Sequence, residues 1–488
     1  MKIIITILFL LTQGLLLAQL NIDWLKQFGG NQFDLLEDMI VTSSGDLLLL
    51  GMSDSPEIPN HSGSSSDIWI MKLSADGNLI WQRSYGGIGR DESTSVIELD
   101  DGFVITGLKE DIGLNDIVVF KIDKEGDLLW EQILREPGQE LDAYIVPSTD
   151  GGFILSFTSW SSDLWSNYGS GDIVLLKLDA QGNMQWSQNF GGSNFDQVVG
   201  LTQNESGDFV IAGHTRSSNF DVNILRSPQD YWILCVDKDN RRVKWERTYG
   251  GGDGTNLLEH LTVMPDGYLL SGSHGGFDLW FIKTDLEGNF VWQNSLETNG
   301  IERIHDVISV SGGFLVCGNS DSTEGDIIGD SNADAFILML DNDGELVFSE
   351  SIAGSRVDAA TAIATSSDYI YLGGDSNSFD GDFSANLGLV DLWVARLNTN
   401  PSASNSPDPA SSLLLYPNPT SEILNINIVQ DHIGSSYSIT NIKGHEVRHG
   451  TIGQTSSMLN IKGWLPGIYT FNLHKNGSTD SVTFYVTK

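Results

Sequence analysis

The sequence has 488 residues, of which 40% are hydrophobic and 19% charged, a balance that excludes a disordered chain and a long-helix protein. Asp and Glu number 65 against 26 Lys and Arg, which gives a formal charge of −39. A surface this acidic repels polyanions, so nucleic acid and anionic lipid are excluded as expected partners.

The chain begins with a short basic and apolar segment. Lys2 precedes a mainly apolar stretch over residues 3–17, and Ala18 offers a cleavage site. A bilayer span needs about 20 apolar residues, but polar Asn21 and Asp23 follow too soon. We therefore predict a signal peptide at residues 1–18 and no transmembrane segment after its removal.

A unit of about 54 residues then repeats along the chain. One half of the unit begins with Asp and an apolar run, the other half carries a Trp or Phe marker, and each half occurs seven times. The Asp set comprises Asp67, Asp116, Asp172, Asp230, Asp278, Asp334 and Asp391. The marker set comprises Trp24, Trp81, Trp130, Trp186, Trp245, Trp292 and Phe348. A fixed period of this length indicates a repeat architecture.

Each repeat is predicted to form four strands, as over residues 95–99, 103–107, 116–122 and 128–133. The strand 67–73 is apolar on both faces, which is typical of a sheet covered on both sides. Stacked propeller blades are covered in this way. The chain enters at the last strand of a unit and leaves at the third strand of another. We therefore predict an all-β, seven-bladed β-propeller over residues 20–398, closed by its N-terminal strand, rather than an open solenoid.

The run from Asp172 through Gly182 and Trp186 to Gly191-Gly192 resembles the repeats of exported bacterial β-propeller proteins. The resemblance covers about residues 22–398. It implies the fold and leaves the activity open.

Residues 399–412 are rich in Pro, Ser and Asn and are predicted to form a linker. Residues 413–488 lack the repeat, and we expect a small Ig-like β-sandwich with strands at 423–428, 436–442, 457–461, 467–473 and 481–486.

This module opens with Tyr416-Pro417-Asn418-Pro419 and carries Leu465-Pro466-Gly467-Ile468-Tyr469 before its penultimate strand. It resembles the type A C-terminal sorting domain of the type IX (Por) secretion system. The resemblance implies that residues 413–488 engage the secretion machinery, which carries the protein across the outer membrane to the cell surface or the medium.

The long, variable loops of the propeller are predicted to lie at one end, opposite the tight turns. They span residues 52–66, 159–171, 214–229, 319–333 and 374–390. Variable loops on a rigid scaffold are where binding sites are usually built.

An acidic residue follows six of the seven Trp or Phe markers by ten positions. These residues are Asp34, Asp91, Glu140, Asp196, Glu302 and Asp358, with Thr255 as the seventh. They open the innermost strands, so they are candidates for an acidic ring at one mouth of the channel that attracts a cation. The alternative is that each carboxylate bonds its own Gly-Gly turn.

Two loops are rich in acidic residues and are candidate Ca²⁺ sites, since calcium takes 6–8 oxygen ligands. The candidates are Asp321, Asp326, Asp375, Asp380 and Asp382, with Glu324 and Asp330 beside them. The alternative is that these loops are solvated and bind no metal.

The loop 159–171 contains Trp160, Trp165 and Tyr168, which lie outside the repeat pattern. Aromatic faces on a loop-bearing surface suit stacking on sugar rings. Alternatively, the rings fold inward and anchor the loop.

The sequence shows no nucleophile elbow, phosphate loop or zinc spacing. We therefore expect a non-catalytic protein that binds an extracellular glycan or protein. A polysaccharide hydrolase or lyase and a purely structural adhesion protein remain the alternatives. Cys235 and Cys317 lie a blade apart in apolar strands and are expected to be unpaired.

Overall fold

The computed structural model describes residues 21–62, 65–111, 113–135, 138–161, 167–252, 254–275, 278–327, 332–398, 413–416, 423–428, 432–441, 445–462, 464, 467–475 and 478–486. These residues form strands and turns, without an α-helix. None of them therefore belongs to a helix that could span a membrane. The chain divides into two compact units, one of Ile22–Leu397 and one that contains Asn398–Lys488. The predicted signal peptide lies outside the described residues.

The first unit consists of seven four-stranded sheets, which we call blades and number in chain order. Blade 1 comprises β2 (Asp34–Val41), β3 (Leu47–Ser53), β4 (Asp67–Leu73) and β5 (Leu79–Tyr85). Blade 2 comprises β6 (Asp91–Leu99), β7 (Gly102–Asp111), β8 (Leu114–Ile122) and β9 (Leu128–Leu134). Blade 3 comprises β10 (Glu140–Pro147), β11 (Phe153–Ser159), β12 (Asp172–Leu178) and β13 (Met184–Phe190). Blade 4 comprises β14 (Asp196–Gln203), β15 (Phe209–Thr215), β16 (Asp230–Val236) and β17 (Val243–Tyr249).

The remaining blades follow the same order from the innermost to the outermost strand. Blade 5 comprises β18 (Leu257–Met264), β19 (Gly267–His274), β20 (Asp278–Thr284) and β21 (Phe290–Leu296). Blade 6 comprises β22 (Glu302–Val310), β23 (Gly313–Ser320), β24 (Asp334–Asp341) and β25 (Leu346–Ile352). Blade 7 comprises β26 (Asp358–Thr365), β27 (Tyr369–Ser376), β28 (Asp391–Asn398) and β1 (Asn21–Phe28).

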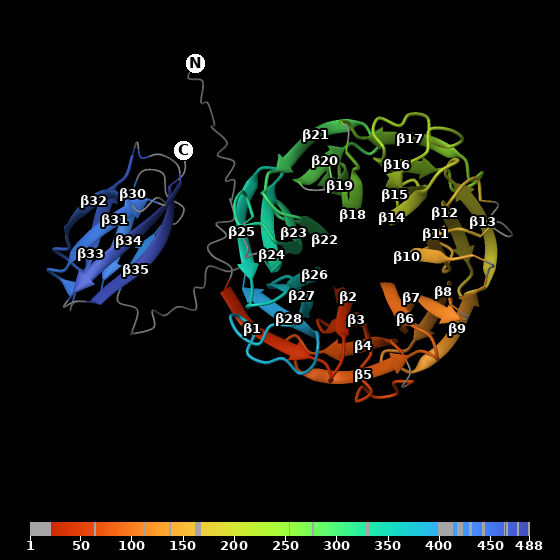
Figure 1. Cartoon of the computed structure of the whole chain (residues 1–488), viewed down its shortest axis with the longest axis horizontal. Coiled ribbons are helices and arrows are strands. Elements are labelled where there is room, and N and C mark those ends of the chain that lie inside the picture. The colour runs from red at the N-terminus through yellow and green to blue at the C-terminus, as the bar shows by residue number, and fades with distance from the viewer. Residues whose placement is uncertain are drawn as a thin grey trace, which may run out of the picture. The chain divides into compact units, whose positions relative to one another are not determined.

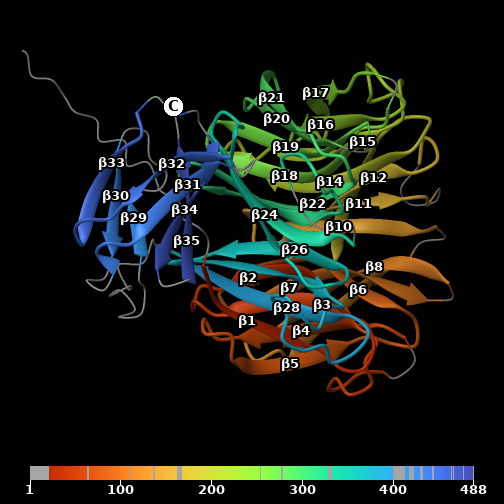
Figure 2. The same ribbon diagram turned by 60° about the vertical axis from the view of Figure 1, so that its left-hand side comes forward.

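The blades form a closed ring. The innermost strands contact one another in a circuit that runs from β2 through β6, β10, β14, β18 and β22 to β26 and back to β2. Figure 1 shows this ring face-on, and in Figure 2 the same strands are seen obliquely. The N-terminal strand β1 pairs with β28, so the two ends of this unit complete one blade. The prediction of an all-β, blade-based propeller closed by its first strand is confirmed.

The middle strands of each blade are buried on both faces. Every residue of β3, β12, β15 and β16 is buried, although successive side chains point to opposite faces. One hydrophobic cluster contains Val104 and Ile117 of blade 2 together with Leu155 and Val174 of blade 3. The apolar strands therefore hold the ring together by packing sheet on sheet.

The tryptophans of the outermost strands pack against the tight turn of the next blade. Trp81 donates its indole N–H to the carbonyl oxygen of Lys124 at 3.1 Å. A glycine lies beneath the ring at five of these junctions, namely Gly77, Gly126, Gly182, Gly288 and Gly344, each with a φ between +70° and +85°. Glycine is favoured at these positions for two reasons: the backbone is left-handed, and the ring leaves no space for a Cβ.

Both cysteines are free and buried, as predicted. Cys235 lies in β16 and Cys317 in β23. Burial raises the pKa of the Cys235 thiol to about 11, so the reactive thiolate is scarce at neutral pH.

The second unit consists of two sheets around one core. The three-stranded sheet contains β29 (Leu413–Tyr416), β30 (Ile423–Ile428) and β33 (Ser456–Asn460). The four-stranded sheet contains β31 (Ser436–Asn441), β32 (Glu446–Thr451), β34 (Gly467–Lys475) and β35 (Ser478–Val486). Leu424 of one sheet and Ile439 and Phe471 of the other share a hydrophobic cluster. The sequence had not predicted β29 or β32.

Gly344→Ala should destabilise the propeller by about 3 kcal/mol or more, because an added Cβ would lie 2.5 Å from the Trp292 ring. Gly45→Ala is the matched control, since its φ is also +83° but no atom lies within 4 Å of the added Cβ. The control should lose only the backbone term of about 1 kcal/mol. Denaturant unfolding measures both variants, and equal losses would contradict the packing role of the tryptophan.

Candidate functional site

A buried carboxylate opens the innermost strand of every blade except blade 5. These are the acidic residues predicted at the channel mouth, Asp34, Asp91, Glu140, Asp196, Glu302 and Asp358, and each is at most 2% exposed. The expectation of an open ring of negative charge is corrected, because these side chains are enclosed by protein.

Hydrogen bonds within the protein account for this burial. The amide of Gly192 donates to Oδ2 of Asp196 at 2.7 Å, Ser217 donates to the same oxygen at 2.8 Å, and the Thr215 hydroxyl donates to Oδ1. Serine hydroxyls donate to four of the other acidic residues in the same way. Ser53 and Ser55 donate to Asp34, and Ser159 donates to Glu140. Ser320 and Ser322 donate to Glu302, and Ser376 and Ser378 donate to Asp358. In blades 1, 3, 4, 6 and 7 the second strand ends in Ser or Thr, any residue, then Ser, and this recurrence is the sequence signal that identifies these partners.

The backbone of the same acidic residues reaches the preceding blade. The amide of Asp196 donates to the carbonyl of Gly171 at 2.9 Å, and the amide of Asp34 donates to the carbonyl of Val390 at 2.9 Å. In blades 1, 2, 4 and 7 the acidic residue therefore joins its own blade, the connecting turn and the previous blade.

A second carboxylate lies on the other side of the connecting turn. Asp172 ends the loop before β12, and a Cβ on Gly191 would lie 2.2 Å from its Oδ1 and 2.9 Å from Oδ2 of Asp196. Gly29 and Gly86 are enclosed in the same way by Asp391 and by Asp67. Burial, with the nearby charge of Asp196, raises the pKa of Asp172 to about 7.

Blade 5 departs from this arrangement. Thr255 replaces the acidic residue, and the buried Asn256 takes over the contact with blade 4. The Asn256 side chain donates to Ser227 at 2.8 Å and lies 2.6 Å from Nδ1 of His274. This junction therefore lacks the carboxylate that opens the other innermost strands, while the buried Asp230 remains beside it and accepts from Ser227.

Acidic side chains that the sequence analysis did not single out lie further along the innermost strands. They are Glu37, Asp38, Glu92, Asp142, Glu259 and Asp306. Desolvation by the surrounding protein, together with the charge of Glu92, raises the pKa of Glu37 to about 7. Burial, with the charge of Asp306, raises that of Asp38 to about 7. Burial also raises the pKa of Glu259 to about 7 and that of Asp142 to about 6.

The acidic residues considered for calcium bind backbone amides instead. Asp321 accepts from Ile301 at 2.6 Å and Asp326 from Glu297 at 3.0 Å. Asp375, Asp380 and Asp382 accept from the amides of Leu36, Ser355 and Ala353. Within the described residues, no three His, Cys, Asp or Glu side chains are grouped to hold a metal ion. Asp330 lies outside the described residues.

The aromatic residues of the loop 159–171 do not form one cluster. Trp160 is half-buried and stacks on Phe195, with 5.3 Å between ring centroids. Tyr168 is 42% exposed and stacks instead on Phe220 from the neighbouring blade, with 5.1 Å between centroids and 14° between planes. Trp165 lies outside the described residues. The pair of Tyr168 and Phe220 was not predicted, because Phe220 lies in a different loop.

Phe220 has an unusual backbone. Its φ is +58°, a left-handed conformation that bulky side chains rarely adopt, yet its ring is 66% exposed. Its neighbours hold it in place, since Asn219 bonds the backbone and hydroxyl of Ser193 and Val222 is 1% exposed.

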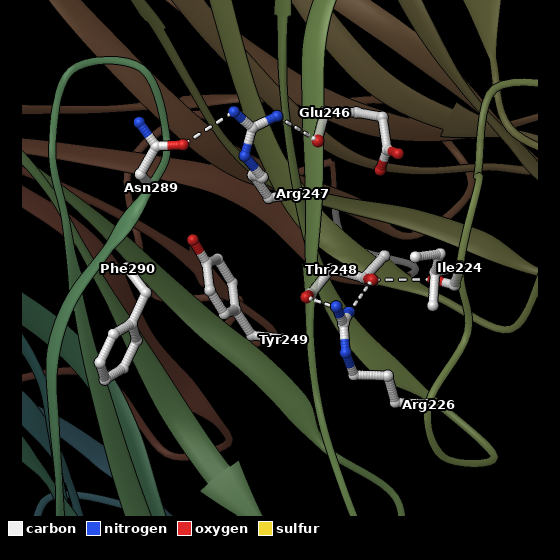
Figure 3. A pocket seen from close by; sticks show the side chains of 8 residues that line it. All are labelled: Ile224, Arg226, Glu246, Arg247, Thr248, Tyr249, Asn289 and Phe290. Atoms are coloured by element: carbon white, nitrogen blue, oxygen red, sulfur yellow. Dashed lines mark hydrogen bonds between the residues drawn. The ribbon is translucent and has the colours of Figure 1, made fainter.

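The same loop, residues 214–229, also borders a pocket of about 230 Å³ on the outer wall between blades 4 and 5 (Figure 3). Its lining residues are Ile224, Arg226, Glu246, Arg247, Thr248, Tyr249, Asn289 and Phe290. Two guanidinium groups and two aromatic rings therefore border one opening.

Residues 414–487 match the family of secretion system C-terminal sorting domains. The chain carries such a domain, which confirms the predicted resemblance and indicates export through the type IX secretion system to the cell surface or the medium. Within it, Gly467 begins β34 and Tyr469 is buried against Trp464. Tyr416 ends β29, whereas Pro417, Asn418 and Pro419 lie outside the described residues.

No curated protein matches the chain. Among solved structures, it is similar to PorZ, an essential surface component of the type IX secretion system of Porphyromonas gingivalis, at 12% identity and a TM-score of 0.45 over 94% of this chain and 60% of PorZ. It is also similar to puromycin hydrolase (13% identity, TM-score 0.46, 90% and 59% of the two chains). For the acylaminoacyl peptidase of Pyrococcus horikoshii the identity is 10% and the TM-score 0.41, over 82% and 60% of the two chains. The chain thus spans about 60% of the length of each of these three proteins. Sequence identities this low do not allow the activity of these proteins to be assigned to this chain.

Ser217→Ala should lower the free energy of unfolding by about 1–3 kcal/mol, because it removes a hydroxyl donor from the buried carboxylate of Asp196. Ser218→Ala is the matched control, since Ser218 is exposed and adjacent in sequence. Its effect should stay within about 0.5 kcal/mol. Denaturant titrations compare the two, and a silent Ser217→Ala would contradict the role of the junction.

The propeller should be more stable at pH 5.5 than at pH 8. Glu37, Asp38, Asp172 and Glu259 have pKa values of about 7 when folded, above their ordinary values, so the folded state binds more protons between these limits. The free energy of unfolding therefore falls as pH rises through 7. His214, whose pKa burial lowers to about 4, and His305, whose pKa burial also lowers, act in the opposite sense but are fewer than the four carboxyl groups. Melting temperatures across this range test the sign, and Glu259→Gln should reduce the slope.

Proposed function

We propose that this exported protein binds an extracellular glycan through the stacked rings of Tyr168 and Phe220, without catalysing a reaction. The observation that carries the proposal is Phe220, a bulky residue held at φ +58° with its ring 66% exposed. Such a backbone costs on the order of 1–3 kcal/mol and is found mainly where function maintains it.

The pair is arranged as a binding platform. Two rings at 14° to one another present a flat apolar surface, and flat aromatic surfaces stack on the apolar faces of sugars. The rings come from the long loops of blades 3 and 4, so the platform bridges two blades. The anchors at Asn219 and Val222 fix Phe220 before a ligand arrives, which reduces the entropic cost of binding.

Sorting to the cell surface or the medium supports the proposal, because a ligand met there is extracellular. Trp160 is half-buried and stacks on Phe195, so it is not part of this platform. The rival function of a glycan hydrolase or lyase is tested by the same experiment, because cleavage would release new sugar ends from the bound glycan.

Phe220→Gly should weaken binding to a glycan array by at least about tenfold, while the free energy of unfolding changes by less than about 1 kcal/mol. The stability is preserved because relief of the strained backbone offsets the lost stacking. Asn60→Gly is the matched control, since Asn60 is exposed at φ +67° and should leave binding unchanged. Retained binding with a large loss of stability would assign Phe220 to the scaffold.

A further inference from the structure

Two arginines on the outer wall lack acidic partners. Arg226 and Arg247 both border the pocket between blades 4 and 5, and neither forms an ion pair within the described part of the chain. Other arginines, such as Arg216 and Arg356, also form no ion pair within the described residues, but Arg226 and Arg247 border the same pocket. A pair of positive charges left unneutralised is suited to a negatively charged ligand.

Neutral groups hold the two guanidinium groups in place. Arg226 donates from Nη1 to the carbonyl of Thr248 at 2.6 Å and to its hydroxyl at 2.5 Å. Arg247 donates from Nη1 to the carbonyl of Glu246 at 2.8 Å and from Nη2 to Oδ1 of Asn289 at 2.9 Å. These bonds fix both side chains without an ion pair, and Arg247 keeps a weaker electrostatic interaction with Asp285 in the neighbouring turn.

Nearby carboxylates are engaged elsewhere. Glu246 accepts from Asn223 and from the indole of Trp232, and Asp230 accepts the backbone amide of Arg226 rather than its guanidinium. In Figure 3 the Glu246 carboxylate points away from Arg247.

Blade 1 offers an internal comparison. Arg83 occupies the position of Arg247, with a Trp two residues before and a Tyr two residues after it in both strands. Arg83 lies 3.9 Å from the carboxylate of Asp127, whereas Asn289 stands at the corresponding position in blade 5. The change from carboxylate to amide is what leaves the charge of Arg247 available.

Aromatic rings complete the pocket. Tyr249 and Phe290 line it, and Phe290 is 54% exposed. A second, adjoining hollow extends it to Trp280 and Gln293. Flat rings beside guanidinium groups suit a ligand that has both an apolar ring face and a carboxylate.

The two arginines also close the strand edge to a peptide. Because β17 is the outermost strand, its outward carbonyls could pair with an added strand. The carbonyls of Glu246 and Thr248 are instead occupied by Arg247 and Arg226. This favours a saccharide over an extended acidic peptide.

We propose that the pocket between blades 4 and 5 binds a carboxylated sugar of the uronic acid class, with Arg226 and Arg247 paired to the carboxylate and Tyr249 and Phe290 against the ring. The site is distinct from the platform of Tyr168 and Phe220 and stands independently of the function proposed for it. The strongly acidic remainder of the protein repels polyanions, so short oligosaccharides should bind better than long polymers.

The test is calorimetry of the full chain with a galacturonic acid trisaccharide and with its methyl ester, which has the same rings but no charge. The acid should bind and the ester should bind at least about tenfold more weakly. Arg226→Gln and Arg247→Gln should each weaken binding of the acid about tenfold or more. Arg83→Gln is the matched control and should not change binding.

Three results would overturn the proposal. Equal binding of acid and ester would show that charge is not recognised, and equal weakening by Arg83→Gln would show that only the net charge matters. Binding of a triaspartate peptide as tight as that of the trisaccharide would reject the sugar. The comparison of acid with ester uses the unaltered protein, so it decides the question even if a variant fails to fold.

Discussion

The structure depends on the carboxylate that opens each innermost strand. At Asp196, a single residue accepts the turn amide of Gly192, accepts hydroxyls from Thr215 and Ser217, and donates its own amide to Gly171 of the blade before. Burying a carboxylate is costly unless several donors surround it, and in blades 1, 3, 4, 6 and 7 serine or threonine hydroxyls supply such donors. Apolar packing between blades supplies the cohesion, and this junction fixes the position at which each new blade starts.

The exception at blade 5 is the junction with blade 4, where Thr255 and Asn256 replace the acidic residue that opens the other innermost strands. The outer wall between the same two blades carries Arg226, Arg247 and Asn289 in place of the ion pair that Arg83 makes with Asp127. A repeat protein presents the same position several times in different blades. At the corresponding position of blade 7, Lys26 likewise contacts the amide oxygen of Asn78, so what distinguishes the wall between blades 4 and 5 is the second cation, Arg226, beside Arg247.

The sequence predicted the repeat, the four-stranded unit, the closing N-terminal strand and the sorting domain, because all of these follow from periodic apolar strands and local motifs. It did not predict which acidic residues lie where the innermost strands converge. A β-bulge in those strands, seen between Leu36 and Asp38, interrupts the alternation of faces, and sequence spacing alone does not reveal it. The strand β32 was missed because its residues are nearly all exposed and lack an apolar pattern. The stacking of Tyr168 on Phe220 joins two loops more than fifty residues apart in the sequence.

Two features of this fold are unfavourable for stability and bring no structural benefit. They are the strained backbone of Phe220 and the positive charges of Arg226 and Arg247, which are unpaired in the part of the chain that the structure describes. Most left-handed positions of the described residues hold glycine, such as Gly288 and Gly344 with φ of +70° and +83°, and among the five non-glycine residues with positive φ Phe220 is the one aromatic residue. Likewise, Lys177 lies 2.9 Å from Asp150 and Lys283 lies 2.9 Å from Asp266 at the opposite, tight-turn end, whereas Arg226 and Arg247 have no such partner within the described residues. Both exceptions involve blade 4, and the loop 214–229 contributes to each. Since neither is needed to close the ring, the outer half of this blade is where selection for binding, rather than for folding, is expected to have acted.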